Sequence, residues 1–506
     1  MEFSEDQARA FAALTEQLRG VGVDLETGVA APRAEGDADA LAEVLAVLGK
    51  AGSGKTALLA HLAGRLSAAG MEAIAAEYEP RKRRRNRSFA VLAPTNKAAS
   101  VLRGRGVPAT TVHRVLYVPV YDPEFEKVAR WLTEADAPTP ESERLDADLL
   151  ARIKAAFAVH GSVPAALATA GISGSDFISG WAKRDEALDV GLIDEASMLD
   201  DKLYADLREI FGLLILFGDP AQLAPVGQSG AMAFDALPEA RKLRLGRVHR
   251  QAADSPILDL AHALQDDQVS FDDFERLVEE TAARDDRVVV ASRADADLMA
   301  RAPMLCWRNA TRIRLIAAFR SAHGAPPDAL VPGEPLICDG VELPMKHRKK
   351  RIDLEARGLV KGAQVIYLGD GRKGGFARLN VVGAEAPRVN VAAIIKIEAP
   401  GQEEPLIATA ARMGAVFVHG AACTIHKAQG SQWPEVQVFA PDLFAAAQSG
   451  RVEAGAALWR RLAYVAVTRA QERLFWVNRW RMSRPAAPLG AGDLLAGLAD
   501  DDAGAA

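Results

Sequence analysis

The sequence has 506 residues, 49% of them hydrophobic and 25% charged, so it is too long for one hydrophobic core and two to four domains are expected. Its net charge of −6, from 61 basic and 67 acidic side chains, excludes a global attraction to nucleic acid, so any such affinity must come from local patches. Three widely spaced cysteines (Cys306, Cys338 and Cys423) fit neither a disulfide framework nor a zinc site. The sequence shows no secretory leader and no apolar run of membrane-spanning length, so we expect a cytoplasmic protein.

The first part of the chain alternates helical patterns with apolar runs. Residues 4–19 place Phe11, Leu14 and Leu18 on one stripe, which predicts an amphipathic helix. The apolar runs end in polar residues, as is typical of buried parallel strands whose carboxyl ends carry chemistry. These runs are 44–48, 89–95, 190–195 and 213–219. The alternation predicts an α/β fold with a doubly wound sheet, formed by residues 1–117 and 188–245.

Two segments interrupt this pattern, and a second α/β pattern follows. Residues 118–187 hold clusters of Pro, Glu, Asp and Ser with short Ala-rich helices, and predict an insertion. Residues 246–330 and 416–506 carry the second α/β pattern, in which VFVHGAACTIH (416–426) is predicted to contribute to the sheet. Between them, residues 331–415 contain many Gly and Pro and short alternating runs, which predict a small β-rich insertion.

The string GKAGSGKT (49–56) matches a phosphate-binding loop at each fixed position. Its glycines let backbone N–H groups turn toward phosphate oxygens, its lysine reaches the outer phosphates, and its threonine ligates Mg²⁺. The nucleotide-binding candidates are Gly52, Ser53, Gly54, Lys55 and Thr56. A chance Gly-rich turn is the alternative, but the preceding strand and the following helix disfavour it.

Two adjacent carboxylates, Asp194 and Glu195, end the apolar run in LIDEAS (192–197). Asp194 is predicted to hold Mg²⁺, and Glu195 to polarise the attacking water as general base. Alone, the pair would fit a solvated strand end; downstream of a complete phosphate-binding loop it indicates hydrolysis. A hydrolytic base also speaks against a kinase, whose acceptor supplies the nucleophilic hydroxyl.

Gln222 and two arginines complete the catalytic candidates. Gln222, in LFGDPAQLAPVG (216–227), offers an amide that can bond a γ-phosphate or its water. Arg250 and Arg469 are candidates for stabilising the transferring phosphoryl group, an effect of about 10³–10⁵ in rate. A surface charge is the alternative for each arginine, and for Arg469 taken alone it would be the better interpretation. An arginine this far along the chain from the loop implies a site between two domains.

Taken in order, these strings resemble the motor of superfamily 1 helicases. The matched strings are FSEDQARA (3–10), GKAGSGKT (49–56), APTNKAASVLR (93–103), TTVHRVL (110–116), LIDEAS (192–197), GDPAQLAPVG (218–227), GRVHRQ (246–251), TIHKAQGSQW (424–433) and YVAVTRA (464–470). The resemblance implies two RecA-like P-loop domains, 1A and 2A, that sandwich ATP, with Gln7 reading the adenine. It also implies that residues 118–187 form domain 1B with a pin that splits the duplex, and that residues 331–415 form an SH3-like domain 2B.

The forms of TTVHRVL and TIHKAQGSQW are similar to those of the RecD-like and Dda-like group, which moves 5′→3′ on single-stranded DNA. The resemblance places Gly430 on the phosphate side of the site. It also implies a set of nucleic-acid contacts, which are Thr95, Asn96, His113, Thr424 and His426. For His426, a core histidine bonded to a neighbouring strand stays open as an alternative.

Other residues have a less specific link to nucleic acid. The basic runs RKRRRNR (81–87) and KHRKKR (346–351) fit either phosphate-attracting patches or solvated charged loops. Trp181 and Trp433 could stack on bases, but buried packing is the favoured prediction for both.

The sequence therefore predicts an ATP-hydrolysing, Mg²⁺-dependent DNA helicase or translocase. The expected partners are single-stranded DNA, duplex junctions and proteins of DNA repair, recombination or replication, and we expect a monomeric motor. Three alternatives stay open: a translocase that does not unwind, an RNA-directed helicase, and a non-motor P-loop switch or binding module. The last leaves TIHKAQGSQW and YVAVTRA unexplained.

Overall fold

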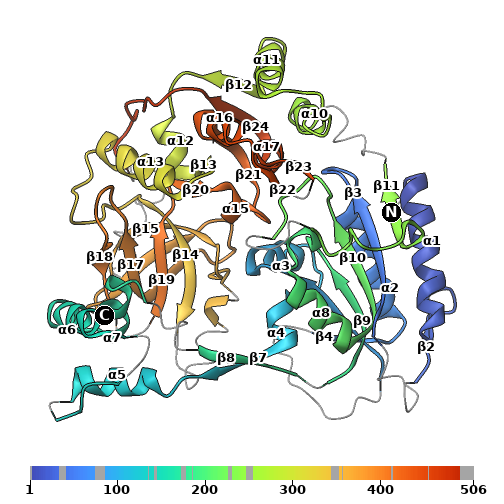
Figure 1. The fold of residues 1–506 in the computed structure, drawn as a ribbon, viewed down its shortest axis with the longest axis horizontal. Coiled ribbons are helices and arrows are strands. Elements are labelled where there is room, and N and C mark those ends of the chain that lie inside the picture. The colour runs from blue at the N-terminus through green and yellow to red at the C-terminus, as the bar shows by residue number, and fades with distance from the viewer. Residues whose placement is uncertain are drawn as a thin grey trace.

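The protein is described here by a computed structural model. It describes residues 3–32, 41–74, 86–134, 136–141, 145–172, 178–184, 186–225, 231–246, 255–342, 353–355, 357–411, 414–453 and 455–489. Its elements form two α/β lobes, a small barrel and an inserted helical segment (Figure 1). Among the described helices, none is both long and apolar enough to cross a bilayer.

The first lobe is built on a parallel sheet with a core on each face. Along β3, Leu45 and Val47 enter one buried cluster while Ala46 and Leu48 enter the other. Because both faces are buried, the strands appear in the sequence as continuous apolar runs. In sheet order they are β11 (Lys242–Leu245), β3 (Glu43–Gly49), β10 (Phe211–Gly218), β9 (Leu188–Ile193), β5 (Ser88–Ala93) and β4 (Glu72–Ile74), with β6 (Ala109–Thr111) paired to β5. The helices of the lobe are α1 (Glu5–Gly20), α2 (Lys55–Ala68), α3 (Asn96–Arg103), α4 (Val112–Leu116) and α8 (Asp201–Ile210).

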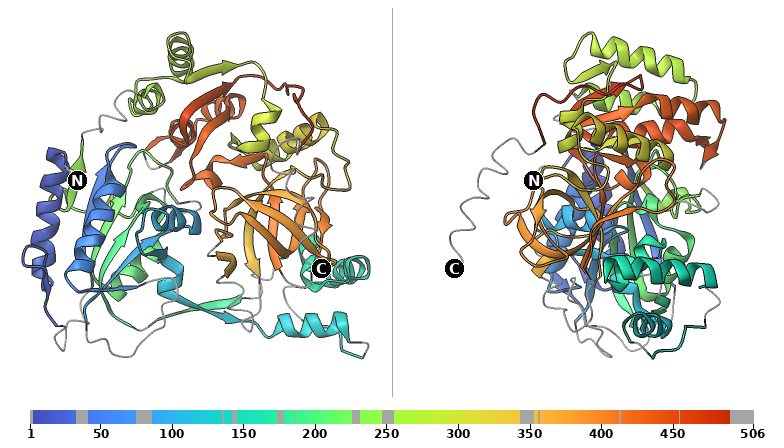
Figure 2. Two further views of the ribbon diagram at one scale, coloured as in Figure 1. Left: turned by 180° about the vertical axis from the view of Figure 1, so that it is seen from behind. Right: turned by 90° about the vertical axis from the view of Figure 1, so that its left-hand side faces the viewer.

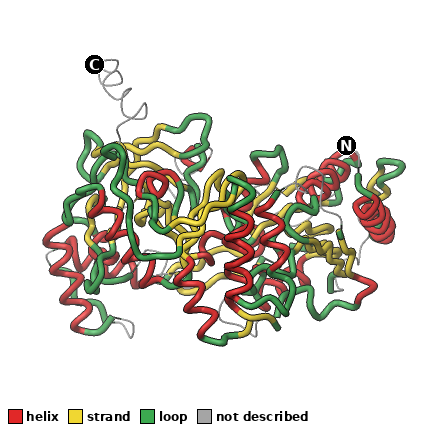
Figure 3. The backbone as a smooth tube through the Cα atoms, turned by 90° about the horizontal axis from the view of Figure 1, so that it is seen from above, coloured by secondary structure: helices red, strands yellow, loops and turns green. Residues whose placement is uncertain are grey.

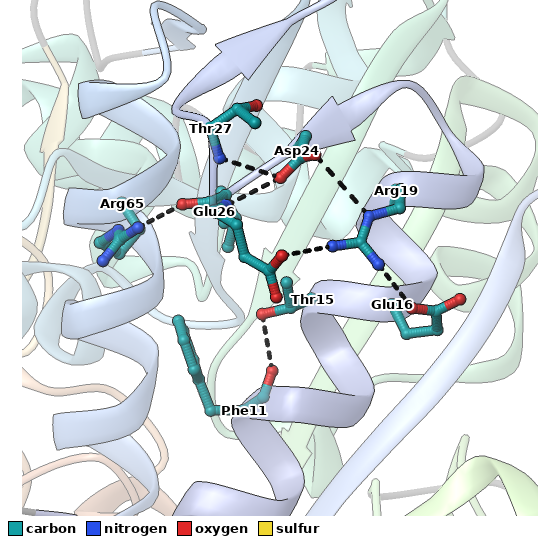
Figure 4. Close-up of polar contacts among 9 residues, drawn as sticks. Phe11, Thr15, Glu16, Arg19, Asp24, Glu26, Thr27 and Arg65 are labelled. Carbon is teal, nitrogen blue, oxygen red and sulfur yellow. Dashed lines mark hydrogen bonds and ion pairs between the residues drawn. The ribbon is translucent and has the colours of Figure 1, made fainter.

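Polar contacts fix α1 and the short hairpin after it, β1 (Val23–Asp24) and β2 (Val29–Ala30), against α2 (Figure 4). Arg19 pairs with Glu16 at 2.9 Å and with Glu26 at 2.9 Å, and Arg65 of α2 donates to the Leu25 carbonyl. Helix α1 lies at one end of the molecule (Figure 3). Its first turn faces the phosphate-binding loop, which is how Gln7 reaches that loop.

The second lobe repeats the plan with a smaller parallel sheet. Its strands, in sheet order, are β12 (Val288–Ala291), β24 (Ala470–Val477), β21 (Trp433–Phe439), β13 (Met304–Cys306) and β20 (Ala422–Thr424). Its helices are α10 (Pro256–Ala263), α11 (Phe271–Ala282), α12 (Ala296–Arg301), α13 (Asn309–Ala322), α15 (Ile425–Ala428), α16 (Ala440–Gln448) and α17 (Leu458–Val467), with a hairpin of β22 (Val452–Glu453) and β23 (Ala456–Ala457) before α17. The predicted α/β class with two parallel sheets is thus confirmed.

A six-stranded unit is inserted between α13 and β20. Its strands are β14 (Pro335–Glu342), β15 (Gln364–Asp370), β16 (Phe376–Val381), β17 (Arg388–Ile397), β18 (Leu406–Thr409) and β19 (Gly414–His419). Because β16 pairs with both β15 and β17, five of the strands close into a barrel and β18 extends it. Residues 416–419 therefore lie in the barrel, which differs from the prediction that the whole 416–426 string belongs to the second α/β pattern. Gly420 marks the transfer, since an added Cβ would lie 3.0 Å from the Leu336 backbone.

The inserted helical segment leaves and re-enters the first lobe through an antiparallel ribbon. It consists of β7 (Tyr117–Tyr121), α5 (Glu124–Thr133), α6 (Ala147–His160), α7 (Val163–Thr169) and β8 (Ile178–Lys183). Helix α7 lies against the barrel (Figure 2). Its Ala165 and Ala168 share a buried cluster with Ile394 and Ile407 of the barrel. This packing joins the insertion of the first lobe to the insertion of the second.

Candidate functional site

The phosphate-binding loop connects β3 to α2 and has the backbone that its sequence predicts. Gly52 and Gly54 take φ angles of 81° and 80°, a left-handed region that side chains disfavour. The ammonium of Lys55 donates to the carbonyls of Gly49 at 2.5 Å and Lys50 at 2.9 Å, so it folds back over its own loop. In the described chain, the hydroxyl of Ser53 is buried without a hydrogen-bond partner. These features suit a loop that wraps an anionic ligand.

Gln7 is fully buried at the start of α1, where it completes a capping box with Ser4. Its side-chain amide donates to the carbonyl of Gly54 at 3.2 Å. The structure thus brings Gln7 to the phosphate-binding loop, and its reading of adenine stays a prediction.

The two predicted carboxylates follow β9, which is separated by one strand, β10, from β3, the strand that leads into the loop. Burial raises the pKa of Asp194 to about 7, and the charge of the adjacent Glu195 adds to the rise. Glu195 has φ 52° and ψ 41°, and it is the one non-glycine residue with positive φ in the described chain. Such strain costs about 1–2 kcal/mol and is typically held at functional sites.

The donors at this point fit a magnesium ion. Thr56 on α2 offers a hydroxyl and Asp194 a carboxylate, which are the hard oxygen ligands that Mg²⁺ prefers. A carboxyl group whose pKa is raised by burial is one that a cation would stabilise. Among the described residues, no group of three or more His, Cys, Asp or Glu is placed to hold a metal ion.

Arg469 enters this site from the second lobe. The residue is 5% exposed, and its guanidinium donates to the carbonyls of Val465 and Ser431, each at 3.0 Å, and to the hydroxyl of Thr468 at 3.1 Å. Burial lowers the pKa of Arg469, and the charge of Glu195 in the first lobe acts in the opposite direction. The structure therefore places Arg469 close enough to the predicted general base for their charges to interact.

The contact between the lobes centres on residues 219–224, which follow β10. We call the surface where these residues, the phosphate-binding loop and α3 meet the second lobe the seam. Gln222 is 6% exposed and accepts from the hydroxyl of Ser197 at 3.2 Å. Gln429 of the second lobe donates to the carbonyl of Leu223 at 3.5 Å. Gln222 thus lies beside the loop that carries both carboxylates.

Three polar residues of the second lobe hold residues 219–224, and sequence reasoning missed all three. Arg461 donates to the carbonyls of Pro220, at 3.0 Å, and Gln222. Glu453 accepts from the backbone N–H of Ala224 at 2.9 Å. Tyr464, 1% exposed, bonds both to Asp219 and to the phosphate-binding loop. The available signal was the presence of two arginines and a tyrosine in a mostly apolar helix, because buried polar groups require partners.

The predicted nucleic-acid contacts meet partly at the same seam. Thr95 caps α3, and Asn96 is its first residue. Thr424 caps α15, while His426 lies within it, partly buried, and burial lowers its pKa. Gly430 has φ 74°, and a Cβ there would lie 3.3 Å from the Thr95 hydroxyl, so the two matched segments touch across the seam.

His113 lies apart from these residues, at the base of the β7–β8 ribbon. Its ring is 6.1 Å from that of Trp181, which is 47% exposed rather than buried as predicted. Trp433 instead donates its indole N–H to Gln364 of the barrel at 2.9 Å, in line with a packing role. Arg250 and the basic run 346–351 lie outside the described residues, as does most of 81–87.

Two family models match the chain. One, described as an AAA domain, covers residues 38–289, and the other, a UvrD-like helicase C-terminal domain, covers residues 419–477. They contain the phosphate-binding loop and carboxylates in the first lobe and Arg469 in the second. The two models, an AAA domain and the C-terminal domain of UvrD-like helicases, support the resemblance to superfamily 1 helicases.

No curated protein matches this chain. Among solved structures it is similar to Bacteroides Pif1 bound to single-stranded DNA, with 14% identity, a TM-score of 0.47, and coverage of 99% of this chain and 98% of that chain. It is also similar to the Pif1 helicase from Candida albicans, with 14% identity, a TM-score of 0.45, and 99% of each chain covered. Identities this low transfer no residue roles.

Proposed function

We propose that this helicase is an ATP-driven motor that moves 5′→3′ along single-stranded DNA and unwinds duplexes ahead of it. One observation carries the proposal: the same seam joins the ATP-site residues and the segments matched to strand binding. Arg469 approaches Glu195 there, and Gly430 abuts Thr95. A site divided in this way links ATP hydrolysis to movement of one lobe against the other.

In the proposed reaction, ATP binds with its phosphates against the N–H groups of the loop and the N-terminus of α2. Lys55 leaves the carbonyls of Gly49 and Lys50 to meet the outer phosphates. Bound Mg²⁺, held by Thr56 and Asp194, would neutralise phosphate charge. Glu195 orients and deprotonates the attacking water, while Gln222 bonds the γ-phosphate or that water.

The arginines make the reaction depend on closure. Arg469, and Arg250 by resemblance, stabilise negative charge on the transferring phosphoryl group, so the lobes are drawn together by ATP and released after hydrolysis. Asn96, His113 and His426 are proposed to grip the strand together with Thr95 and Thr424. Alternating grip between the lobes would then convert each cycle into a step.

We extend the proposal to the organisation of the chain. The first and second lobes would be domains 1A and 2A, the ribbon with its helices domain 1B, and the barrel an SH3-like domain 2B. Three free cysteines, all buried, fit a reducing compartment, so we place this monomeric motor in the cytoplasm, in DNA repair, recombination or replication.

The test is ATPase and strand displacement with tailed duplexes. Single-stranded DNA should stimulate ATP hydrolysis more than RNA does, and a duplex with a 5′ tail should be separated while one with a 3′ tail is not. Stimulation without strand separation would leave a translocase, and stronger stimulation by RNA would leave an RNA-directed helicase. No stimulation by either polymer would refute the motor.

Two variants test the assignment of the site. Lys55→Ala should abolish ATP hydrolysis, and Glu195→Gln should retain ATP binding while losing turnover. Turnover near that of the wild type in either variant would refute the role proposed for that residue.

A further inference from the structure

The hydroxyl of Tyr464 forms two hydrogen bonds across the seam. It accepts from the backbone N–H of Ala51 in the phosphate-binding loop at 3.0 Å and donates to the carboxylate of Asp219 at 2.6 Å. Burial raises the pKa of Tyr464 well above its usual value, so the group stays a neutral hydroxyl and can donate. Tyr464 is 1% exposed and Asp219 is 1% exposed, so water does not compete for these bonds.

Asp219 connects the hydroxyl of Tyr464 to the segment that follows β9 and carries Glu195. Its second carboxylate oxygen accepts from the N–H of Ala221 at 3.0 Å, and its carbonyl accepts from the N–H of Gln222 at 3.1 Å. The side chain of Gln222 in turn accepts from Ser197 at 3.2 Å, two residues beyond Glu195. A continuous set of bonds therefore runs from Tyr464 of the second lobe to the segment that carries the proposed general base.

This inference rests on the proposed function. We propose that Tyr464 is a positioning residue that couples contact between the lobes to the ATP site. Because strand binding holds the lobes together, Tyr464 also couples strand binding to the ATP site. Its two bonds join different lobes, so they are made only while the lobes touch. The strand-binding segments touch at the same seam, where Gly430 meets Thr95. A bound strand that holds the lobes together thus fixes residues 219–222 and Ala51 in place, and the ATP site becomes competent for hydrolysis.

The decisive variant is Tyr464→Phe, which removes only the oxygen and keeps the buried ring. Its control is Tyr367→Phe, because Tyr367 also donates to an aspartate, Asp370, at 2.6 Å, but within the barrel. With saturating single-stranded DNA, Tyr464→Phe should lower kcat about tenfold, as expected for a lost hydrogen bond to a charged group, with KM for ATP changed less than about twofold. Tyr367→Phe should keep the stimulation of the wild type. Equal stimulation in both variants would overturn the inference, as would a rise in KM without a fall in kcat.

Asp219→Asn, which alters the other partner of the same bond, supplies a second arm, and each variant is compared per folded molecule. If the two side chains act through one bond, the double variant should be no slower than the slower single variant; effects that multiply would overturn the inference. The proposed function fails separately: in that case the wild-type helicase itself shows no stimulation by DNA.

Discussion

Two buried arginines of the second lobe differ in what surrounds their charge. Arg320, 7% exposed, pairs with the fully buried Glu334 at 3.0 Å. Glu334 also receives a bond from His419 at 2.7 Å, and we call these three residues, placed where the chain passes between α13 and the barrel, the joint. Arg469 at the seam is equally buried but bonds only to two carbonyls and a hydroxyl. In the described chain, no carboxylate forms an ion pair with Arg469.

A buried cation without a counter-charge is unfavourable, whereas a paired one is largely compensated. The joint therefore satisfies its charges internally and serves the architecture. At the seam, the charges of Glu195 and Asp219 of the other lobe act on Arg469 without forming an ion pair with it among the described residues, so the charge remains available to an anionic ligand. Burial alone therefore does not separate a structural arginine from a functional one, whereas the identity of its partners does.

Arg469→Ala is expected to have the largest effect of the variants considered. We expect ATP hydrolysis to fall about 10³-fold, because the charge that stabilises the transferring phosphoryl group is lost. The free energy of unfolding should fall less than on removal of Arg320, because the variant loses hydrogen bonds to two carbonyls and a hydroxyl but leaves no unpaired buried carboxylate. Steady-state ATPase and urea denaturation measure the two effects. The control is Arg473→Ala, an exposed arginine nearby on β24 that pairs with Glu435 at 3.1 Å. If the ATPase activity of Arg469→Ala stays within tenfold of wild type, the charge of Arg469 has no catalytic role.

Arg320→Met should show the opposite pattern. It leaves the buried carboxylate of Glu334 with only His419 as a side-chain partner, so the free energy of unfolding should fall by about 3–5 kcal/mol. ATPase per folded molecule should remain close to wild type. Arg301→Met is the matched control, because it removes an exposed pair with Glu435 at 3.4 Å, for which about 0–1 kcal/mol is expected. If the two variants lose similar amounts of stability, the buried ion pair of the joint contributes no more than an exposed ion pair.

The sequence predicted the strand ends that form the ATP side of the seam, but neither the joint nor the residues of the second lobe that hold the seam together. The strand ends that carry the phosphate-binding loop and Asp194 were predictable, because strands buried on both faces are apolar throughout and stop where polar residues begin. The passage from barrel to sheet at Gly420 was not, since both flanking strands are apolar. Tyr464 and Arg461 were missed as site residues because their partners lie about 240 residues earlier in the chain, and one sequence does not pair them.

Gly430→Ala tests whether the close contact between the lobes at the seam is needed for activity. The residue has φ 74°, and an added Cβ would lie 3.3 Å from both Ala98 and the Thr95 hydroxyl. Gly450, with φ 62° and no atom within 4 Å, is its control. Both variants should lose about 1–2 kcal/mol of stability through backbone strain, but only Gly430→Ala should also weaken DNA-stimulated ATPase, because it pushes the lobes apart. Equal activity in the two variants would mean that the contact with Thr95 does not matter for closure.

The smallest effect is expected at the joint, as a dependence of stability on pH. The Nδ1 of His419 accepts from the N–H of Ala421 at 3.2 Å, so its proton lies on Nε2, which donates to Glu334. Burial lowers the pKa of His419, with the charges of Arg320 and Arg312 adding to the decrease and Glu334 opposing it.

As pH falls through the unfolded value of 6.5, the unfolded chain takes up a proton that folded His419 does not, so stability decreases. Glu334 acts in the same direction at lower pH: burial would raise its pKa, but the bond from His419 keeps it below 4.5. His419→Gln can make both hydrogen bonds without titrating, so its thermal midpoint should change less than that of the wild type between one pH unit above and one below 6.5. If the thermal midpoints of His419→Gln and the wild type change equally with pH, protonation of His419 does not affect the stability of the joint. Glu334 would then hold Arg320 whether or not the histidine is protonated.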